Sequence, residues 1–159
     1  MSLITDAYSR KIVGFFLSAD LAAIGCIRAL EMALATWLQQ DYLIHHSDRG
    51  LQYCSQGYSK LLKEKGIAIS MTQSGDPLEN ALAERVNGIL KEELLEKVYP
   101  TFQEAQLAIA MAISIYNHQR PHLSVDMLTP VEAHSREGDL KRHWKNYYTA
   151  NREKQASMH

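Results

Sequence analysis

The sequence predicts a single α/β domain in which helices flank a mixed sheet. Three observations carry this prediction. Short apolar segments of strand length alternate with helical patterns over residues 3–71, longer helical patterns follow, and 159 residues are the length of one domain. Hydrophobic residues make up 46% of the chain and charged residues 22%, a composition that excludes a disordered chain, a collagen-like repeat and a disulfide scaffold.

The first half of the chain is expected to supply the sheet. The expected strands are Leu3–Thr5, Ile12–Leu17, Tyr42–His45 and Ile67–Met71, with a turn at Asp6–Arg10. The expected helices are Ala19–Gln39, which Ser18 can cap, and Tyr58–Lys65, which Gly66 ends. In the first of these, the apolar stripe is expected to contain Leu21, Ile24, Ile27, Leu34 and Leu38. Because a helix precedes the strand at Tyr42–His45, part of the sheet is expected to be parallel.

The second half is expected to be helical. Three segments begin with a capping residue followed three positions later by glutamate, and they predict helices over Pro77–Lys97, Phe102–His118 and Pro130–Ser135. The tail from Leu140 is rich in Lys and Arg and is expected to be a frayed basic helix. The expected organisation is a partial catalytic core at 1–97, a helical extension at 98–137 and a basic tail at 138–159.

Charge and cysteine content limit the class of function. The net charge of −1 argues against a dedicated nucleic-acid-binding module, but not against a nucleic-acid enzyme whose metal site needs carboxylates. Cys26 and Cys54 are expected to be buried, reduced thiols. The N-terminus lacks a signal-peptide pattern, and the longest apolar run, Leu107–Ile113, is too short to cross a membrane. A cytoplasmic protein without a membrane partner is therefore expected.

Two carboxylates are the main candidates for chemistry. Asp48 follows a predicted strand within a polar loop, and ligand sites of α/β sheets gather at the carboxyl ends of strands. Glu84 lies on the polar face of a predicted helix, opposite its apolar stripe. Considered alone, each residue also has a non-catalytic interpretation: Asp48 as a solvated turn aspartate and Glu84 as a solvated glutamate on a polar helix face. On the helical face of Glu84 lie Asn80, Asn87, Gly88 and Lys91.

Several short motifs, in this order and spacing, resemble a known family. They are Asp6-x-x-Ser9-Arg10-Lys11-x-Val13-Gly14, His46-Ser47-Asp48-Arg49-Gly50-x-Gln52-Tyr53, Asn80-Ala81-x-x-Glu84, Leu90-Lys91, Tyr116-Asn117-x-x-Arg120-Pro121-His122 and Thr129-Pro130. Thirty-five residues lie between Asp48 and Glu84, and Lys91 follows seven positions later. Over roughly residues 3–134 the chain resembles the catalytic core of bacterial insertion-sequence transposases, which are related to retroviral integrases.

The resemblance implies a ribonuclease-H-like fold and a three-carboxylate site for phosphoryl transfer on DNA. Asp48 matches the second catalytic aspartate and Glu84 the glutamate, and both are expected to bind metal. The implied cofactor is Mg²⁺ or Mn²⁺, with two ions in the intact family site. The implied partners are DNA, as transposon ends and target, and a second copy of the chain or a full-length transposase. The residues expected to contact DNA are Lys91, Asn80, His46, Arg49 and Arg120.

One departure from the family affects the expected activity. The family's first catalytic aspartate lies on a central strand that precedes Leu3, so this chain is expected to lack both that strand and that residue, and to be inactive by itself. Asp6 matches a turn position instead, and its expected role is to accept backbone hydrogen bonds. The alternatives are a non-catalytic remnant that only associates, and a stand-alone nuclease that uses Asp6.

Two further groups of residues have uncertain roles at this point: the adjacent histidines, and the residues at the end of the helix expected at Phe102–His118. His45 and His46 are expected to point to opposite faces of a strand, which argues against a shared zinc ion. Tyr116, Asn117, Arg120 and His122 are expected either to bind DNA backbone or to lock this helix onto the core. Removal of the central strand leaves three outcomes open: the flanking strands pair directly, a second copy fills the gap, or the sheet stays open. We expect a gap or a poorly ordered N-terminus.

Overall fold

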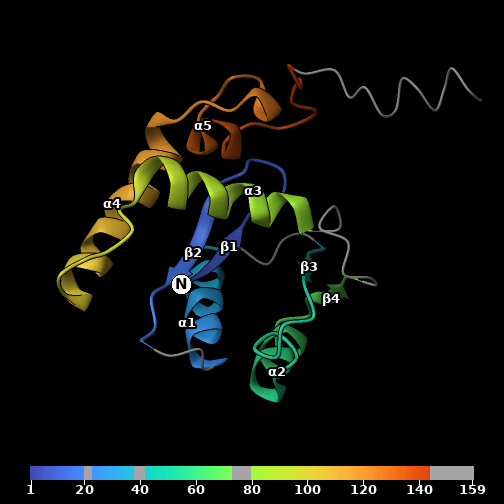
Figure 1. Cartoon of the computed structure of the whole chain (residues 1–159). Helices are drawn as coiled ribbons and strands as arrows, with labels where there is room; N and C mark the ends of the chain where they lie inside the picture. Colours follow the sequence, from blue (N-terminus) through green and yellow to red (C-terminus); the bar gives the residue numbers. More distant parts are fainter. Residues whose placement is uncertain (20–22, 38–41, 73–79, 144–159) are drawn as a thin grey trace, which may run out of the picture.

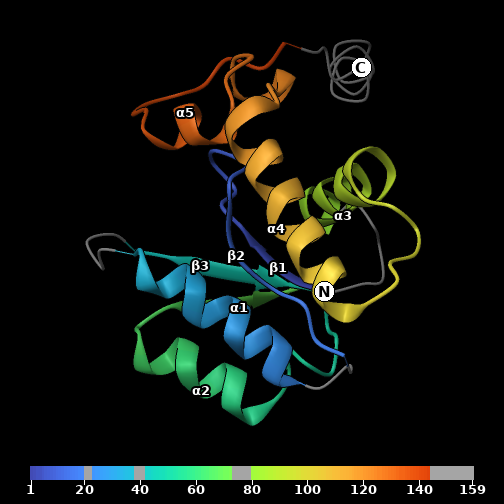
Figure 2. The same ribbon diagram turned by 90° about the vertical axis from the view of Figure 1, so that its left-hand side faces the viewer.

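The computed structural model describes residues 1–19, 23–37, 42–72 and 80–143 (Figure 1). Its elements form three layers, with the strands in the middle. Helices α1 (Ala23–Ala35) and α2 (Gln56–Glu64) lie on one side of the strands, and α3 (Ala81–Ile89) and α4 (Phe102–Gln119) lie on the other (Figure 2). This arrangement confirms the predicted mixed α/β architecture.

The strands form two separate pairs. β1 (Ser2–Thr5) runs antiparallel to β2 (Ile12–Phe16), with Ile4 opposite Gly14. β3 (Ile44–Ser47) runs parallel to β4 (Ala68–Met71), which confirms the predicted parallel pairing. Within the described residues the two pairs are not joined, so β1 and β3 each keep an unpaired edge. The strands that would flank the missing one, β1 and β3, therefore do not pair directly, and the expected gap is present among the described strands. The N-terminus is not poorly ordered, because it forms β1.

Strand β3 lies two residues later than predicted. The sequence suggested Tyr42–His45, but Tyr42 is 80% exposed and the ladder with β4 pairs Ile44 with Ala68 and Ser47 with Met71. The apolar side chain of Tyr42 misled the prediction, because an exposed aromatic ring and a buried one look alike in a short segment. Asp48 nevertheless follows the strand directly, as predicted.

Helix α1 packs closely against the β1–β2 pair. A Cβ at Gly14 would overlap the carbonyl oxygen of Ala29, so only glycine permits this approach. The buried face of α1 therefore consists of small and medium residues: Gly25, Cys26, Ala29 and Leu30. The expected stripe was wrong at Ile24, which is 49% exposed. Leu21 and Leu38 lie outside the described residues.

The later helices begin as predicted where the structure describes their starts. Thr101 accepts the N–H of Glu104 ahead of α4, and Thr129 forms a full capping box with Glu132 ahead of α5 (Pro130–His134). α3 continues as a π-helical turn, Leu90–Leu94, and so ends three residues before the predicted Lys97. The expected start at Pro77 lies outside the described residues.

The end of the described chain differs from the prediction. Residues 140–143 are not helical: Asp126 N–H donates to the Lys141 carbonyl oxygen at 2.8 Å and His143 N–H to that of Leu123 at 2.8 Å. These bonds hold the segment against the 3-10 turn at Leu123–Val125. The rest of the expected basic tail lies outside the described residues. No described helix is long and apolar enough to cross a membrane.

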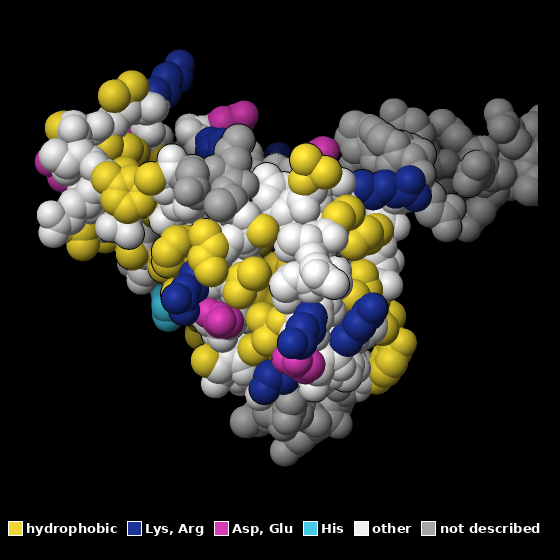
Figure 3. Space-filling view, turned by 90° about the horizontal axis from the view of Figure 1, so that it is seen from below, with side chains coloured by type: hydrophobic (Ala, Val, Ile, Leu, Met, Phe, Trp, Pro, Cys, Tyr) yellow, Lys and Arg dark blue, Asp and Glu magenta, His cyan; other side chains and the backbone are white. Residues whose placement is uncertain are grey.

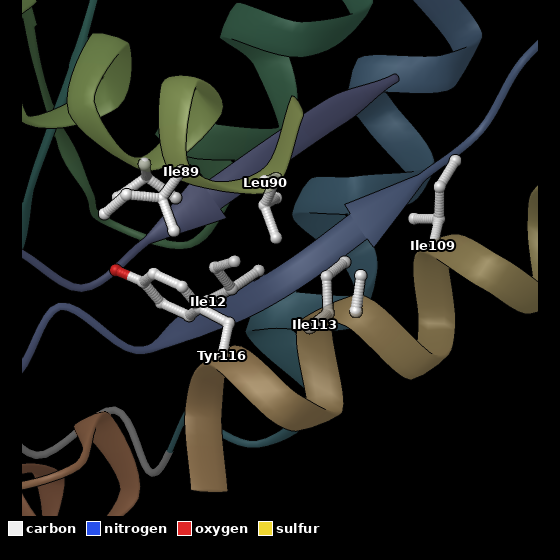
Figure 4. Packing of buried hydrophobic residues seen from close by; sticks show 8 residues of the cluster. Ile12, Ile89, Leu90, Ile109, Ile113 and Tyr116 are labelled. Atoms are coloured by element: carbon white, nitrogen blue, oxygen red, sulfur yellow. The ribbon is translucent and has the colours of Figure 1, made fainter. Parts of the chain in front are cut away.

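Two hydrophobic clusters form the core. The larger one packs β2, α3 and α4 together (Figure 4), and its buried members are Ile12, Val86, Ile89, Leu90, Ile109, Ala112, Ile113 and Tyr116. The smaller one lies between α1 and α2 and contains Cys26, Leu30, Tyr58, Leu62 and Ile67. Both cysteines are free, but only Cys26 is buried; Cys54 is exposed, so the expectation that both are buried was wrong.

A buried side chain fixes α4 to the first strand pair. The Asn117 carboxamide accepts the N–H of Ile12 at 3.0 Å and donates to the Ile12 carbonyl oxygen at 3.0 Å. The Tyr116 hydroxyl donates to the Arg10 carbonyl oxygen at 3.1 Å. These bonds decide the open alternative for Tyr116 and Asn117, because both side chains lock the helix onto the core.

Replacement of Asn117 by Ala is expected to lower the free energy of unfolding by about 2–4 kcal/mol, because two buried backbone groups of Ile12 lose their partner. Chemical denaturation followed by circular dichroism measures the change. Ser114→Ala, at an exposed position one turn earlier in α4, is the matched control and is expected to be nearly neutral. Equal stability of the two variants would show that the Asn117 bonds do not hold α4.

Candidate metal and DNA site

Asp48 begins the loop that follows β3. Its side chain is exposed, and its Oδ1 accepts the Gly50 N–H at 2.9 Å. A Cβ at Gly50 would lie 2.9 Å from this same oxygen and 2.9 Å from the Gln52 Oε1, closer than real Cβ contacts. A glycine at position 50 therefore lets two side-chain oxygens, from Asp48 and Gln52, gather around one turn.

A hydrogen bond to the residue that follows β4, and packing against the smaller core cluster, hold this loop. Arg49 Nε donates to the Thr72 carbonyl oxygen at 2.7 Å, so the guanidinium predicted to contact DNA is anchored on one edge. The Tyr53 ring packs against the smaller core cluster. Burial, the nearby Cys26 and the charge of Asp48 raise the pKa of Tyr53 to about 12, which keeps this hydroxyl neutral beside the carboxylate.

Glu84 lies in the first turn of α3. Its side chain is exposed, while Val86 and Ile89 on the other side of the helix are buried, as predicted. Within the described residues Glu84 takes part in no ion pair. A Cβ at Gly88 would meet nothing within 4 Å, so the polar face of α3 is open one turn after Glu84. Lys91 is exposed on the π-helical turn. Asn80 occupies the N-cap position of α3, but its side chain makes no capping hydrogen bond.

The pairing of Asp48 with Glu84 stays a prediction. β4 and α3 are connected by residues 73–79, which lie outside the described part. In the described part, no three or more His, Cys, Asp or Glu side chains are grouped so that they could hold a metal ion.

The two adjacent histidines point to opposite faces of β3, as predicted. His45 faces the smaller core cluster, where its Nε2 lies 2.9 Å from the Tyr58 hydroxyl. His46 is exposed, and its Nδ1 lies 2.9 Å from the Ser70 Oγ on β4. His46 therefore lies on the open surface near Asp48 in sequence, whereas His45 is a packing residue.

Asp6 has the turn role that the sequence predicts. Its Oδ2 accepts the Ser9 N–H at 2.9 Å, the Ser9 hydroxyl and, at 3.3 Å, the His134 Nδ1 of α5. Burial raises the pKa of Asp6, but the bonds from Ser9 and the contact with His134 outweigh it, and the pKa is lowered. The carboxylate ties the β1–β2 turn to α5, which argues against the stand-alone nuclease that needs Asp6 as a metal ligand.

Arg120 and His122 lie at the end of α4. Arg120 donates Nε and Nη2 to the Glu93 carboxylate at 3.1 Å and 2.7 Å, so part of its charge is neutralised. His122 is 8% exposed, and its ring lies 4.9 Å from that of Tyr116. Burial and the charges of Arg120, Arg10 and Arg85 lower the pKa of His122 to about 4. Arg10 and Arg85 were not predicted as site residues; Arg10 stood inside a quoted motif, but Arg85 gave no signal.

Comparison with protein families gives two overlapping matches. Residues 1–77 match one model described as an integrase core domain, and residues 65–130 match a second model with the same description. A protein assigned as the transposase of insertion sequence element IS986/IS6110 from Mycobacterium tuberculosis is 36% identical over 139 residues, covering 83% of this chain and 50% of that protein. The IS629 transposase of Shigella sonnei is 33% identical over 135 residues, covering 84% and 45%. The chain thus spans about half the length of these relatives.

Solved structures share the fold. The HTLV-2 integrase catalytic core, solved with magnesium in a trimeric form, aligns with a TM-score of 0.61 at 20% identity, covering 82% of this chain and 80% of that one. The catalytic core of BIV integrase aligns with a TM-score of 0.55 at 18% identity, covering 82% and 90%. The ribonuclease-H-like fold expected from the resemblance is confirmed.

The buried His122 predicts a pH dependence of stability. Because its pKa is lowered in the folded state, the unfolded chain binds the proton first, so stability falls as the pH falls from about 6.5 towards 4. The loss is on the order of 2–3 kcal/mol. His122→Phe keeps a ring against Tyr116 and is expected to flatten this pH dependence in chemical denaturation. His118→Phe, at an exposed position, is the control and is expected to keep the pH dependence of the wild type. An equal dependence of the unfolding free energy on pH in the wild type and in His122→Phe would show that His122 is not its source.

Proposed function

The chain belongs to the integrase core family of insertion-sequence transposases, and from this premise we propose that it is the catalytic-core part of a DNA transposase. The complete enzyme would cut DNA at the element's ends and join the new 3′-hydroxyl to target DNA. The observation that carries the proposal is the placement of two exposed carboxylates, Asp48 directly after β3 and Glu84 on the open face of α3, in a fold of integrase cores.

The donor groups suit a hard divalent cation. Asp48 and Glu84 offer carboxylate oxygens, which Mg²⁺ and Mn²⁺ prefer over sulfur or nitrogen. Within the described residues neither carboxylate takes part in an ion pair, and Asp48 uses only Oδ1, for the Gly50 N–H. The anchored turn around Gly50 supports a fixed direction for the Asp48 side chain. The residues therefore fit the divalent metal that the family implies.

The proposed roles divide between the metal ligands and the groups around them. When bound, divalent metal would activate the attacking oxygen and stabilise the leaving oxygen of the phosphodiester. Asp48 and Glu84 would hold it. Lys91, exposed on the π-helical turn, would neutralise a backbone phosphate, and Asn80 and His46 would orient the strand beside it. Arg49 would contribute from the free edge of its guanidinium, since its Nε is bonded to Thr72.

Metal binding is the direct test of these roles. Calorimetric titration with Mn²⁺ is expected to show binding that falls at least tenfold in Asp48→Asn and in Glu84→Gln, because each change removes one anionic ligand. Glu92→Gln, at an exposed carboxylate of the π-helical turn, is the matched control and is expected to leave the affinity unchanged. A loss of affinity in only one of the two variants would separate Asp48 from Glu84.

These 159 residues alone are expected to cleave DNA poorly. Two carboxylates can hold a metal ion weakly, but a two-ion clamp needs a further bridging ligand. The same preparations, incubated with labelled duplex DNA and Mg²⁺, provide the measurement. Robust nicking by the wild type that disappears in Asp48→Asn would overturn this expectation.

A second candidate function is association without chemistry. Among the described strands β1 and β3 each have an unpaired edge, which favours association because an open strand edge is a template for pairing with another chain. The partner would be a second copy or a full-length transposase.

The open edges predict low thermal stability or self-association. Size-exclusion chromatography at rising concentration, with thermal denaturation, is expected to show either. Ile44→Lys, at an exposed position of β3, is expected to reduce association because an edge lysine blocks strand pairing. Ile24→Lys, at an exposed position of α1, is the matched control. A sharp transition of a stable monomer would show that the open edges are without consequence.

A further inference from the structure

Four arginines from distant parts of the sequence lie around the end of α4, close enough for their charges to act on one another or on His122. They come from the β1–β2 turn, α3, the end of α4 and the segment after α5, and we call them the arginine corner: Arg10, Arg85, Arg120 and Arg142. None of these segments predicts the corner on its own. Only the fold brings the four charges into one place.

Contacts of Arg10, and of the residues that neighbour the other arginines, hold the corner. The Arg10 carbonyl oxygen accepts the Tyr116 hydroxyl, and Arg10 Nε donates to the Ser124 Oγ at 3.3 Å. The His122 ring packs on Tyr116, two residues after Arg120. The 3-10 turn that follows His122 is bonded to the backbone of Lys141 and His143, which flank Arg142. Arg85 stands next to Val86, which packs in the same core cluster as Tyr116.

The positive charges of the corner influence one another. Burial and the charge of Arg142 lower the pKa of Arg10, and the charges of Arg120, Arg10 and Arg85 act on the buried His122. His122 is therefore neutral at pH 7 and leaves the positive charge to the guanidinium groups. Like charges that act on one another repel, and a bound anion would relieve this repulsion.

The acidic residues nearby neutralise the corner only in part. Glu93 pairs with Arg120, and the charge of Asp6 acts on Arg10, although Asp6 is itself bonded to Ser9 and His134. Asp126 pairs with His143 at 2.7 Å. Within the described residues, Arg85 and Arg142 are exposed and take part in no ion pair. Elsewhere, some basic side chains stand beside acidic ones, as on the face seen from below (Figure 3) and in the pairs Arg28–Glu31 and Lys60–Glu64.

The guanidinium groups of Arg10 and Arg120 are held in place by hydrogen bonds that occupy only some of their N–H donors. Arg10 donates Nε to Ser124 and Nη1 to the Ala7 carbonyl oxygen, and Arg120 gives Nε and Nη2 to Glu93. In the described chain this leaves Arg10 Nη2 and Arg120 Nη1 without a hydrogen-bond partner. A planar group fixed along one edge presents its other donors in a defined direction, which suits the tetrahedral oxygens of a phosphate.

We propose that the arginine corner binds a backbone phosphate of DNA, as a contact separate from the carboxylates Asp48 and Glu84. The inference rests on the proposed action on DNA for its choice of ligand, but not on any metal. Such a contact carries no base information, and it would fix the register of the duplex on the domain.

The test measures DNA binding without metal, so that it does not depend on Asp48 and Glu84. The whole chain is titrated in EDTA into a fluorescent duplex, and anisotropy is recorded over a range of sodium chloride concentrations. The double variant Arg85→Gln/Arg142→Gln is expected to bind about tenfold more weakly or worse, and to lower the slope of log K against log salt by about 2. Both side chains are exposed, so the fold is expected to survive, and circular dichroism checks this.

The matched control is Lys63→Gln/Lys65→Gln, which removes two exposed positive charges at the end of α2. It is expected to leave the affinity nearly unchanged. Equal weakening by both double variants would overturn the proposal, because it would show only a general attraction between charges. Unchanged binding in the arginine variant would overturn it as well.

A second experiment distinguishes a phosphate of the DNA backbone from free inorganic phosphate as the ligand of the arginine corner. Inorganic phosphate is titrated while the His122 ring signals are followed by NMR. Weak, millimolar phosphate binding that raises the pKa of His122, and that competes with the duplex, is expected. Tight binding of inorganic phosphate that leaves the affinity for the duplex unchanged would overturn the assignment to DNA. Unchanged Mn²⁺ binding in Asp48→Asn, together with weaker DNA binding in the arginine variant, would count against the metal roles alone.

Discussion

The two hydrogen bonds between the Asn117 carboxamide and the backbone of Ile12 are the constraint on which the second half of the structure depends. They satisfy a buried N–H and a buried C=O at the start of β2, on the edge that no other described strand covers, and they do so from α4. With α4 fixed there, Tyr116 meets the β1–β2 turn, and Arg120 and His122 are carried to the same corner. In the sequence this constraint is visible only as the pair Tyr116-Asn117. In the structure the Asn117 side chain makes the two backbone hydrogen bonds that a neighbouring strand would otherwise make.

The two candidate catalytic carboxylates belong to different packing units. The loop of Asp48 is anchored on β4 through Arg49, and its Tyr53 packs against the smaller cluster. Glu84 stands on α3, which packs through Val86 and Ile89 in the larger cluster. Helix α1 joins the two units, because Ala29 lies against Gly14 while Cys26 and Leu30 enter the smaller cluster. The geometry of a shared metal site therefore depends on α1 as much as on the ligands.

Local signals predicted well wherever a short stretch of sequence determines the structure. The capping residues Thr101 and Thr129 and the terminator Gly66 act within one turn, so their elements appear as predicted. Predictions failed where distant parts decide the outcome. The register of β3 is set by β4, the exposure of Ile24 follows from the approach that Gly14 allows, and the arginine corner needs four separate segments. Asp48 and Glu84 are predicted from their family spacing, which one chain's hydrophobic pattern does not contain, and their pairing stays a prediction.

The central claim is that Asp48 and Glu84 hold one divalent ion between them. Anomalous diffraction from crystals grown with Mn²⁺ tests it most directly, because the ion is located independently of the protein atoms. The account predicts a peak with a carboxylate oxygen of each residue at about 2.0–2.3 Å. A structure in which the two carboxylates lie on opposite faces of the domain, or in which Mn²⁺ binds elsewhere, would contradict it.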